Sequence, residues 1–498
     1  MSFYSTRGGA CVTASQAILW GLAKDGGLYV PSMFPQLPKK QIFGFCDQSY
    51  QKIAQQVLSS FLEDYSKPEI TQAVEAAYSP KNFDDPAIAP LRQLDDRLHV
   101  MELFHGPTIA FKDIALQLLP YLVRLAAEKN DEQREISIMV ATSGDTGKAA
   151  LEGFKDVKGT SCTVFYPHDG VSDMQRLQMV TTEGGNTHVI GVKGNFDDAQ
   201  TGVKKLFSSE DFREKMNALG KMPSSANSIN FGRLVPQVVY YFYAYAQLVC
   251  HGKLRMGQPL NFVVPTGNFG DILAGYYAKR MGLPVGKLIC ASNRNNVLSD
   301  FFTDGVYYTH RTFFKTISPS MDILISSNLE RLLYESAGRN AKVVKEWMES
   351  LMSSGSFSIG MQRLEELKQT FEAGFADDLM TREEIKRVYE HTGYLLDPHT
   401  AVASHVQREY HTRTGDFSQT VILATASPYK FAADVLAALQ GEQAVASLDA
   451  FACAQKLQEY SGAPIPKQIT ALKALPVRHK TVCKIDDMQK TMLKELKA

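Results

Sequence analysis

The stretch Val264-Pro265-Thr266-Gly267-Asn268-Phe269-Gly270-Asp271-Ile272 is the strongest local pattern in the sequence. A short apolar run, typical of a buried strand, passes into a turn with two glycines and then into an amphipathic run. Glycines allow backbone N–H groups to approach an anion closely, and a helix N-terminus adds a partial positive charge. The stretch matches neither the P-loop nor the G-x-G-x-x-G pattern. It predicts a phosphate site of another kind, and an ordinary strand-to-helix turn is the alternative that it leaves open.

Short β-branched runs alternate with amphipathic runs along most of the chain. Strands are expected at 136–140, 163–166, 188–192, 262–264, 288–290 and 420–423, and helices at 50–65, 113–129, 203–219, 236–249 and 272–281. This alternation favours an α/β fold with mostly parallel sheets. Residues 327–391 are charged and rich in Glu, Lys and Leu, which predicts a helical insertion.

The composition is that of an ordinary globular protein. The chain has 498 residues, of which 44% are hydrophobic, and its 53 Lys and Arg balance its 53 Asp and Glu. This length predicts about three domains, and the balanced charge gives no general basic field for nucleic acid. Seven scattered cysteines without a C-x-x-C pair, and the lack of a signal peptide or apolar span, favour a reduced cytoplasmic protein that binds no membrane.

A second polar turn, Ala141 to Ala150, also follows an expected strand. Hydroxyls and free amides in Ser143-Gly144-Asp145-Thr146 can bind a carboxylate or a phosphate at the start of a helix. A nucleotide-binding loop is disfavoured, because Thr142 stands where that loop needs glycine and Ala149 lacks a hydroxyl for Mg²⁺. A plain capped helix start is the alternative.

Lys112 is the candidate nucleophile. It follows the apolar run Ile109-Ala110-Phe111 and precedes an amphipathic helix. A lysine in apolar surroundings loses solvation of its ammonium group, which favours the free, nucleophilic amine. Most lysines are solvated surface groups, so Lys112 alone is a weak signal. We find no metal-ligand spacing among the histidines, and His399 with His405 is poorly spaced on a helix.

A reactive lysine together with a phosphate cradle that is not a nucleotide loop suggests pyridoxal phosphate. Phe111-Lys112-Asp113, residues 143–147 and residues 267–271 resemble the fold-type II pyridoxal-phosphate enzymes, and more narrowly the threonine synthase family of the long bacterial and fungal type. Further matching segments are 5–8, 25–31, 291–296, 320–323, 327–328, 397–402 and 425–428. The matches follow the family's order, so their joint specificity exceeds that of any single motif.

The resemblance implies a role for each matching residue. Lys112 forms the Schiff base and then moves protons. The residues implied to bind the cofactor are Lys112, Gly267, Asn268, Phe269, Gly270, Asp271, Thr425 and Asp145, and those implied to bind the substrate are Ser143, Gly144, Thr146, Asn227, Ser228 and Arg233. Asp145 stands where many relatives carry Asn, and Ser427 where many carry His. For the segment Asn227–Arg233, a helix cap with a solvated arginine is the alternative.

The resemblance also implies a fold and a reaction. The fold is the tryptophan synthase β-like architecture, with two open parallel-sheet domains, an N-terminal domain and a helical insertion. The expected division is residues 1–95 as the N-terminal domain, 96–130 with 245–440 as the cofactor domain, 131–244 as the small domain and 441–498 as a helical extension.

The implied reaction converts O-phospho-L-homoserine into L-threonine and phosphate, in a monomer or homodimer with no bound metal. A related phospholyase that releases a keto product, a dehydratase, and a non-catalytic cofactor-binding regulator are the alternatives.

Overall fold

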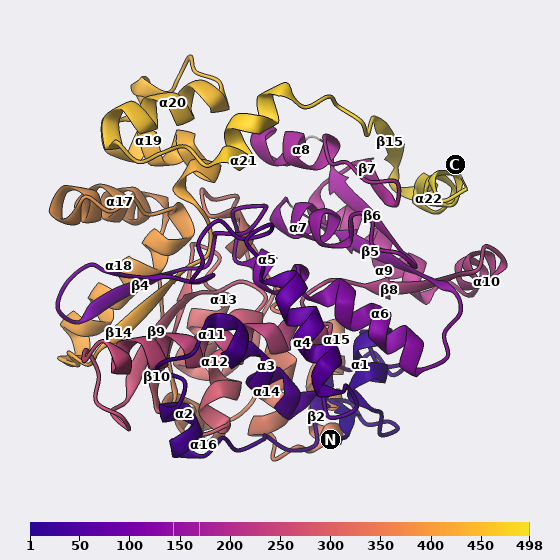
Figure 1. Cartoon of the computed structure of the whole chain (residues 1–498), viewed down its shortest axis with the longest axis horizontal. Helices are drawn as coiled ribbons and strands as arrows, with labels where there is room; N and C mark the ends of the chain where they lie inside the picture. The colour runs from indigo at the N-terminus through magenta and orange to yellow at the C-terminus, as the bar shows by residue number, and fades with distance from the viewer. Residues whose placement is uncertain (143, 169, 498) are drawn as a thin grey trace.

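The computed structural model describes residues 1–142, 144–168 and 170–497. Two separate sheets form its frame (Figure 1). The larger sheet has six strands in the order β13-β10-β9-β14-β4-β3, and only β3 runs antiparallel to its neighbour. Its strands are β3 (Leu91–Gln93), β4 (Leu98–Glu102), β9 (Leu260–Pro265), β10 (Val285–Ser292), β13 (Phe371–Phe375) and β14 (Thr420–Ala424).

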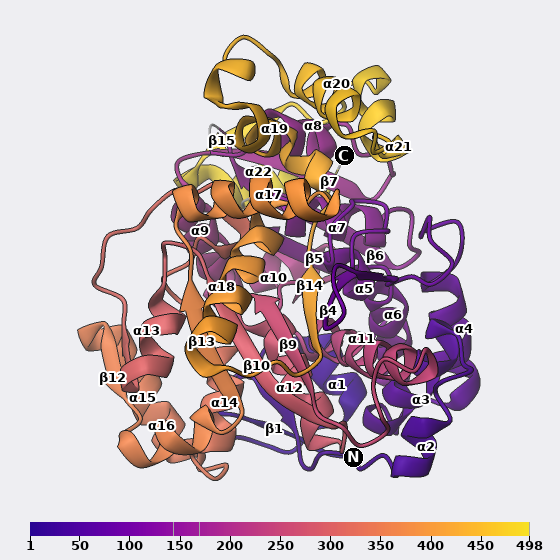
Figure 2. The same cartoon turned by 90° about the vertical axis from the view of Figure 1, so that its left-hand side faces the viewer.

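Both faces of the larger sheet are covered by helices. Val263 and Ile422 belong to one apolar cluster with residues of α18 (Pro398–Thr414), whereas their neighbours Val264 and Val421 belong to another with residues of α11 (Phe231–Cys250) and α12 (Gly270–Arg280). Alternate side chains of a strand point to opposite faces, so both faces are buried and the strands are continuously apolar. Figure 2 shows α18 and α11 on opposite sides of this sheet.

The smaller sheet has five parallel strands in the order β15-β7-β6-β5-β8. They are β5 (Glu135–Ala141), β6 (Thr160–Pro167), β7 (Thr187–Lys193), β8 (Lys221–Ser225) and β15 (Thr481–Lys484). The helices near this sheet are α7 (Asp145–Phe154), α8 (Asp173–Val180), α9 (Phe196–Ser208), α10 (Glu210–Ala218) and α22 (Met488–Glu495). Met488 and Met492 of α22 share an apolar cluster with Met139, Phe165 and Ile190.

The N-terminal part packs against the larger sheet's helices. It contains an antiparallel pair, β1 (Phe3–Ser5) with β2 (Tyr29–Pro31), and the helices α1 (Ala14–Trp20), α2 (Lys39–Phe43), α3 (Tyr50–Phe61) and α4 (Lys67–Ala77). Phe61 of α3 stacks on Tyr277 of α12, and Phe45 meets Phe242 of α11 edge to face. Two further helices, α5 (Lys112–Leu116) and α6 (Leu119–Lys129), lead into the smaller sheet.

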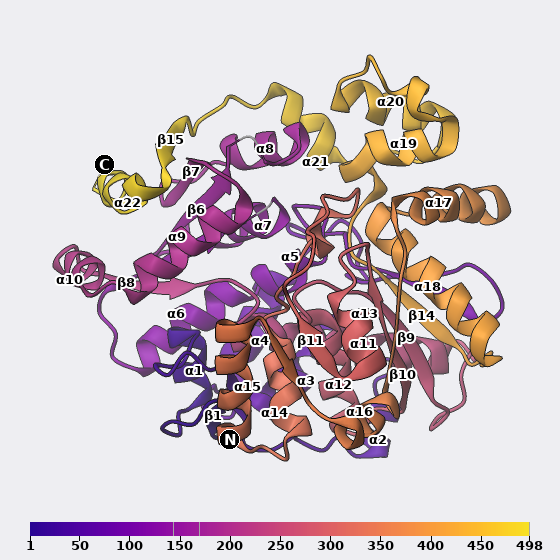
Figure 3. The same cartoon turned by 180° about the vertical axis from the view of Figure 1, so that it is seen from behind.

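The expected insertion and extension both contribute strands as well as helices. The remaining helices of the structure all follow β10 in the chain. They are α13 (Val297–Asp304), α14 (Leu329–Ser336), α15 (Ala341–Ser354), α16 (Met361–Lys368), α17 (Asp378–Thr392), α19 (Ala432–Gln440), α20 (Ala450–Ser461) and α21 (Lys467–Thr470), with the antiparallel pair β11 (Val306–Tyr308) and β12 (Ser356–Ser358). Figure 3 shows the last segment passing over α8 to β15. There Arg478 N–H donates to Val180 O at 2.8 Å.

The prediction of an α/β fold with parallel sheets is confirmed, and each expected strand exists. The purely helical interpretation of 327–391 and of 441–498 is wrong, because β13 and β15 each pair with a sheet formed by distant residues. The expected helix 203–219 is interrupted at Ser209, whose side chain caps α10 by accepting from Phe212 N. Among the described residues, we find no helix long and apolar enough to cross a membrane.

Candidate active site

The carboxyl ends of strands from both sheets converge on one site. In open parallel sheets, ligands bind at these ends because the following loops meet there. β9 leads into the turn 266–269 and β14 into Thr425. The segment after β4 returns beside β14, since Phe111 N–H donates to Thr425 O at 2.8 Å. This hydrogen bond places Lys112, the first residue of α5, next to Thr425.

Lys112 is enclosed by groups from three distant segments. Its Nζ donates to Ser320 Oγ at 3.3 Å and lies 3.6 Å from Asp145 Oδ2, and 12% of its side chain is exposed. Burial lowers the pKa of Lys112; Asp145 opposes this shift, and the positive charges of Lys430 and Arg233 reinforce it. The site therefore shifts Lys112 toward the neutral amine, which is the reactive form.

Asp145 stands between two buried lysines. Lys430 Nζ lies 3.0 Å from Asp145 Oδ1, on the opposite carboxylate oxygen from Lys112, and its side chain is fully buried. Gln175 Nε2 donates to the same Oδ1 at 3.0 Å, and Ser320 Oγ donates to Oδ2 at 3.1 Å. Burial opposes ionisation of Asp145, but the two ammonium groups outweigh it and hold its pKa below the ordinary range.

The turn at residues 266–270 is a rigid cradle. Phe269 adopts the left-handed conformation, with φ of 62°, directly before α12. Ser326 Oγ donates to Gly267 O at 2.7 Å, and Asn328 Nδ2 donates to Asn268 O at 3.0 Å. A Cβ at Gly270 would meet its nearest atoms at 3.5 Å or more, so the chain's own packing does not demand glycine there. A glycine-containing turn that leads directly into a helix N-terminus is suited to binding a phosphate.

Asp271 lies behind this cradle in the first turn of α12. Tyr240 donates a short hydrogen bond to its Oδ1, and Tyr241 donates to the same atom at 3.1 Å, whereas Oδ2 is buried and has no hydrogen-bond partner among the described residues. Burial raises the pKa of Asp271 to about 7. A buried carboxyl with a vacant oxygen is costly unless a ligand group completes it.

The segment Asn227–Arg233 follows β8 and begins α11. Asn230 caps this helix by accepting from Gly232 N. Arg233 is buried rather than solvated. Its Nη1 donates to Ala226 O at 2.5 Å, and its Nε has no partner within residues 1–142, 144–168 and 170–497. Burial lowers the pKa of Arg233 to about 10. A Cβ at Gly270 would lie 3.8 Å from Ser228 Cβ, so this segment adjoins the cradle.

The loop at residues 142–147 differs from the simple anion loop that its sequence suggests. Thr142 Oγ1 accepts hydrogen bonds from Gly144 N and Gly147 N, at 2.9 and 3.0 Å, so these amides already have a partner. Gly144 has φ of 145°, and a Cβ there would lie 2.4 Å from Gln175 Nε2. Thr146 is half-buried, and Ser143 lies outside the described residues.

Four residues that carry the geometry were not assigned roles from the sequence. Ser320 and Lys430 hold Lys112 and Asp145 as described. His399 Nε2 accepts from Ser320 N at 3.1 Å, while its Nδ1 faces Asp397 Oδ1 at 2.8 Å. Arg331 is fully buried and donates to Tyr29 O, Ile229 O and Asn328 Oδ1, joining the N-terminal part to both polar segments. Ser320 and His399 lie in segments that match the family, which could have indicated a role in the site. Arg331 and Lys430 lie outside the matched segments.

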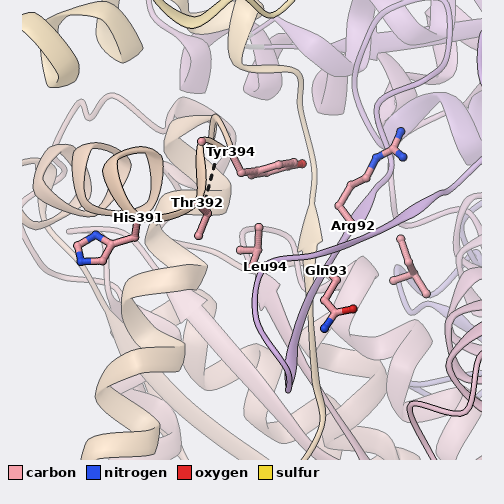
Figure 4. A pocket seen from close by; sticks show the side chains of 8 residues that line it. Arg92, Gln93, Leu94, His391, Thr392 and Tyr394 are labelled. Atoms are coloured by element: carbon pink, nitrogen blue, oxygen red, sulfur yellow. Dashed lines mark hydrogen bonds between the residues drawn. The ribbon is translucent and has the colours of Figure 1, made fainter.

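A separate surface pocket of about 410 Å³ lies between β3 and the end of α17 (Figure 4). Arg92, His391 and Tyr394 are among the side chains that line it, and Tyr394 N–H donates to Thr392 Oγ1 at 3.1 Å. None of the predicted site residues lines this pocket. The candidate active site is therefore the region around Lys112 at the strand ends, and not this pocket.

Comparison with known proteins defines the class first. A family model described as pyridoxal-phosphate dependent enzyme matches residues 86–426, which include Lys112, the cradle and Thr425. Models of the threonine synthase N terminus and C-terminal region match residues 2–78 and 400–491. The chain belongs to the threonine synthase family of pyridoxal-phosphate-dependent enzymes, and it is a lyase with this cofactor.

Individual relatives agree with this family. Threonine synthase of Pseudomonas aeruginosa is 42% identical over 86% of this chain and 89% of its own length. Threonine synthase-like 1 of Homo sapiens is 40% identical over 86% of this chain and 58% of its own length. The structure titled as PLP-bound threonine synthase from Brucella melitensis covers 100% of both chains with a TM-score of 0.88 at 38% identity, and the yeast threonine synthase structure also has a TM-score of 0.88, at 32% identity.

Proposed function

We propose that this enzyme converts O-phospho-L-homoserine and water into L-threonine and inorganic phosphate, with Lys112 as the residue that binds the cofactor covalently. In this reaction the Cγ–O bond breaks and phosphate leaves with the bonding electrons. Cβ loses one proton, Cγ gains one, and water supplies the hydroxyl group that Cβ carries in threonine. The observation that carries the proposal is that two different features suited to anions lie near Lys112: the cradle at 267–270, at a helix N-terminus, and the buried guanidinium of Arg233. A dehydratase acting on a non-phosphorylated amino acid needs only one.

The residues of the site fit pyridoxal phosphate. The N-terminus of α12 and the cradle suit its phosphate, because backbone N–H groups there can donate to an anion and a Cβ at Gly270 would meet no described atom closer than 3.5 Å. Thr425 is buried beside Lys112 and offers a neutral hydroxyl to the pyridine nitrogen. When bound, the cofactor supplies the electron sink that makes protons next to the substrate amine acidic.

Lys112 is the group suited to move these protons. Its nitrogen is largely shielded from water, and its pKa is lowered mainly by burial. A general base works best when its pKa lies near the working pH, so the same environment that favours attachment also favours proton transfer. Ser320 and Asp145 fix the direction of the amine through their contacts with Nζ.

Arg233 is the group suited to hold the leaving phosphate, with Ser228 and Asn227 beside it. A guanidinium presents paired donors to phosphate oxygens, and its unpartnered Nε is available for one of them. Because Arg233 is buried, its charge is weakly screened and stabilises the phosphate as its bond to Cγ breaks. Gly144 and Thr146 remain candidates for the substrate carboxylate, with Thr146 better placed, since the amide of Gly144 is already bonded.

The test is product identification with the purified protein, pyridoxal phosphate and O-phospho-L-homoserine. We expect threonine and phosphate in a one-to-one ratio, and their loss by at least a thousandfold in Lys112→Ala, because the covalent step and its proton transfers disappear. Phosphate with 2-oxobutyrate and no threonine would instead identify a phospholyase. If the protein is folded and binds the cofactor but releases no phosphate, O-phospho-L-homoserine is not its substrate.

The division into domains is also part of the proposal. We place the cofactor domain on the six-stranded sheet and the small domain on the five-stranded sheet, near the boundaries expected from the sequence. Residues 481–484 join the small domain through β15, and α11 packs with the cofactor domain. We propose a cytoplasmic monomer or homodimer, for which light scattering of the purified protein gives the mass.

A further inference from the structure

Lys430 is a buried lysine for which the reaction described above has no direct use. It lies in the short turn Pro428–Phe431 after β14, and its side chain is fully buried. Its Nζ donates to Thr108 O at 2.9 Å and lies 3.0 Å from Asp145 Oδ1. Placing a lysine inside a protein is costly unless its charge is paired, so this position requires a specific reason.

Thr108 connects Lys430 to the helix that begins with Lys112. Thr108 N and Oγ1 donate to Asp113 Oδ2 and Oδ1, at 2.9 and 2.7 Å, and Asp113 is the second residue of that helix. Lys430 therefore contacts both the loop before Lys112 and the carboxylate that faces Lys112. The two lysines approach opposite oxygens of Asp145, and the carboxylate lies between them.

Without Lys430, Asp145 would act against the chemistry of Lys112. A lone carboxylate 3.6 Å from an amine in a buried site stabilises the ammonium form, which cannot attack a carbonyl. A second cation on the far side of the carboxylate cancels most of this effect, because it neutralises Asp145 and repels a proton on Lys112. The carboxylate can then orient Lys112 and Ser320 by hydrogen bonding alone.

We propose that Lys430 is a positioning residue that neutralises Asp145, so that this carboxylate orients Lys112 without keeping its amine protonated. The inference rests on the proposed role of Lys112 as the attachment site. The directions of the pKa shifts agree with it: Asp145 raises the pKa of Lys112, whereas Lys430 and Arg233 lower it. The pKa of Asp145 is in turn lowered by Lys430 first and by Lys112 second, against the effect of burial.

Other charged groups also face this cluster. Asp271 of α12 interacts with Lys112 from the cradle side and has a raised pKa, so it is largely protonated and adds little negative charge below neutral pH. His399 of α18 reaches the cluster only through the backbone of Ser320. Arg233 of α11 adds positive charge. Asp145 is thus the main negative charge on Lys112, and Lys430 is its nearest ion-pair partner among the described residues.

The experiment measures the reactivity of Lys112 directly. The full-length protein, freed of cofactor, is mixed with pyridoxal phosphate at a series of pH values, the product is trapped with borohydride, and modified Lys112 is counted by peptide mass spectrometry. The pH midpoint of the initial rate reports the pKa of the Lys112 amine. We expect Lys430→Met to raise this midpoint by about one pH unit or more, which is about a tenfold lower rate at neutral pH.

Three further variants test whether the pH midpoint shifts in the direction that the proposal predicts. Lys430→Arg should stay close to the parent protein, because the charge is kept. Asp145→Asn should lower the midpoint, since Lys430 then repels the proton on Lys112 without compensation. The double variant Lys430→Met with Asp145→Asn should return toward the parent value, because both charges are removed together.

Lys148 provides the matched control. It is also a buried lysine, on α7, but its Nζ contacts Glu152 Oε1 and Thr182 Oγ1, at 2.5 and 2.9 Å, rather than the cluster. Lys148→Met should lose stability as Lys430→Met does, yet leave the midpoint unchanged. A merely structural role for Lys430 would make the two variants alike in both measurements.

The results that reject the proposal are specific. An unchanged or lower midpoint in folded Lys430→Met overturns it. If Lys430→Met does not fold, the Asp145→Asn variant tests the proposal instead. A pH midpoint that is not lowered in Asp145→Asn would also overturn the proposal. Attachment that persists elsewhere in Lys112→Ala would instead refute the proposed role of Lys112. Normal attachment at Lys112 with a midpoint insensitive to Lys430 leaves that role intact and rejects only the inference.

Discussion

The two candidate anion sites near Lys112 are built in different ways. The turn at 266–270 uses backbone groups: a left-handed Phe269, glycines on either side and the first amides of α12. The segment at 227–233 uses a buried side-chain charge, Arg233, whose Nε has no partner. A site made of backbone is fixed whenever the chain folds, whereas a site made of an unpaired buried charge costs stability until its ligand arrives.

From this difference we infer a distinct task for each of the two candidate sites. A cofactor that stays bound through many turnovers suits the rigid backbone cradle. A phosphate that must enter, leave its carbon and depart suits a charge whose binding energy is realised only while the anion is present. The predictions below test this division, beginning with the backbone site, where we expect the largest effect.

Gly267→Ala should weaken cofactor binding about a hundredfold or more. A Cβ at position 267 would lie 2.6 Å from Ser320 O and 3.4 Å from Met321 Cα, which are backbone atoms that cannot turn aside. The displaced turn also carries the hydroxyl that contacts Lys112. Overpacking of this kind costs about 1–3 kcal/mol or more, and 2.7 kcal/mol is about a hundredfold in affinity. Fluorescence titration of the cofactor-free protein measures the dissociation constant.

Gly185→Ala is the matched control for this prediction. Its φ is ordinary, and a Cβ there would meet no atom within 4 Å. Cofactor affinity should stay unchanged in this variant. If Gly267→Ala also kept normal cofactor affinity but raised the KM for the phosphorylated substrate, the tasks of the two sites would have to be exchanged.

Arg233→Met should raise the KM for the phosphorylated substrate about 10- to 100-fold and leave cofactor affinity unchanged. Hydrogen bonds to charged groups contribute about 1.5–3 kcal/mol, and the guanidinium supplies at least one to the substrate phosphate. The same change should alter the melting temperature of the ligand-free protein little, because loss of the single hydrogen bond from Nη1 to Ala226 O is offset by removal of a buried charge whose Nε has no partner among the described residues. Steady-state kinetics and calorimetry provide the two measurements.

Arg331→Met is the contrasting variant. Arg331 is equally buried, but its guanidinium donates to three acceptors, including Tyr29 O at 2.9 Å and Ile229 O at 2.6 Å. Its loss leaves buried carbonyls without donors, so stability should fall by about 3 kcal/mol. Equal destabilisation in the two arginine variants would contradict the view that Arg233 is held ready for an anion.

The same contrast explains how much of the site could be predicted from the sequence. The cradle was predictable because a strand, a glycine turn and a helix are adjacent in the chain. Lys112 and Thr425 were found through the motifs around them. Lys430 was missed because its burial depends on Asp145 and Thr108, which are hundreds of residues away. No local pattern separates such a lysine from a solvated one.

Long-range packing also accounts for the errors in the fold. β13 and β15 lie in segments with the composition of surface helices, and each becomes a strand because a sheet edge is available to it. β15 pairs with β7, nearly three hundred residues earlier. Strand formation at an edge reflects the neighbour more than intrinsic propensity, so the sequence alone favoured helix there.

His105 offers the smallest and most local test, because it is a half-buried group with a carboxylate on each side. Its ring nitrogens lie 2.8 Å from Asp84 Oδ1 and 3.0 Å from Glu102 Oε2. Burial opposes protonation, but these two carboxylates raise the pKa of His105 to about 9. A pKa raised by folding contributes stability that is complete below the unfolded value of about 6.5 and is lost as the pH rises through 9.

His105→Gln should therefore lower the free energy of unfolding by about 2 kcal/mol at pH 6 and by almost nothing above pH 9.5. Arg233→Met, in contrast, is expected to change stability little. Urea unfolding at pH 6, 7.5 and 9.5 measures this difference, and His251→Gln is the control because His251 is exposed and bonded only within its own helix turn. A pH-independent loss in His105→Gln would mean that the ring acts through packing alone. A loss confined to low pH would show that the ion pairs of His105 with Asp84 and Glu102 stabilise the fold.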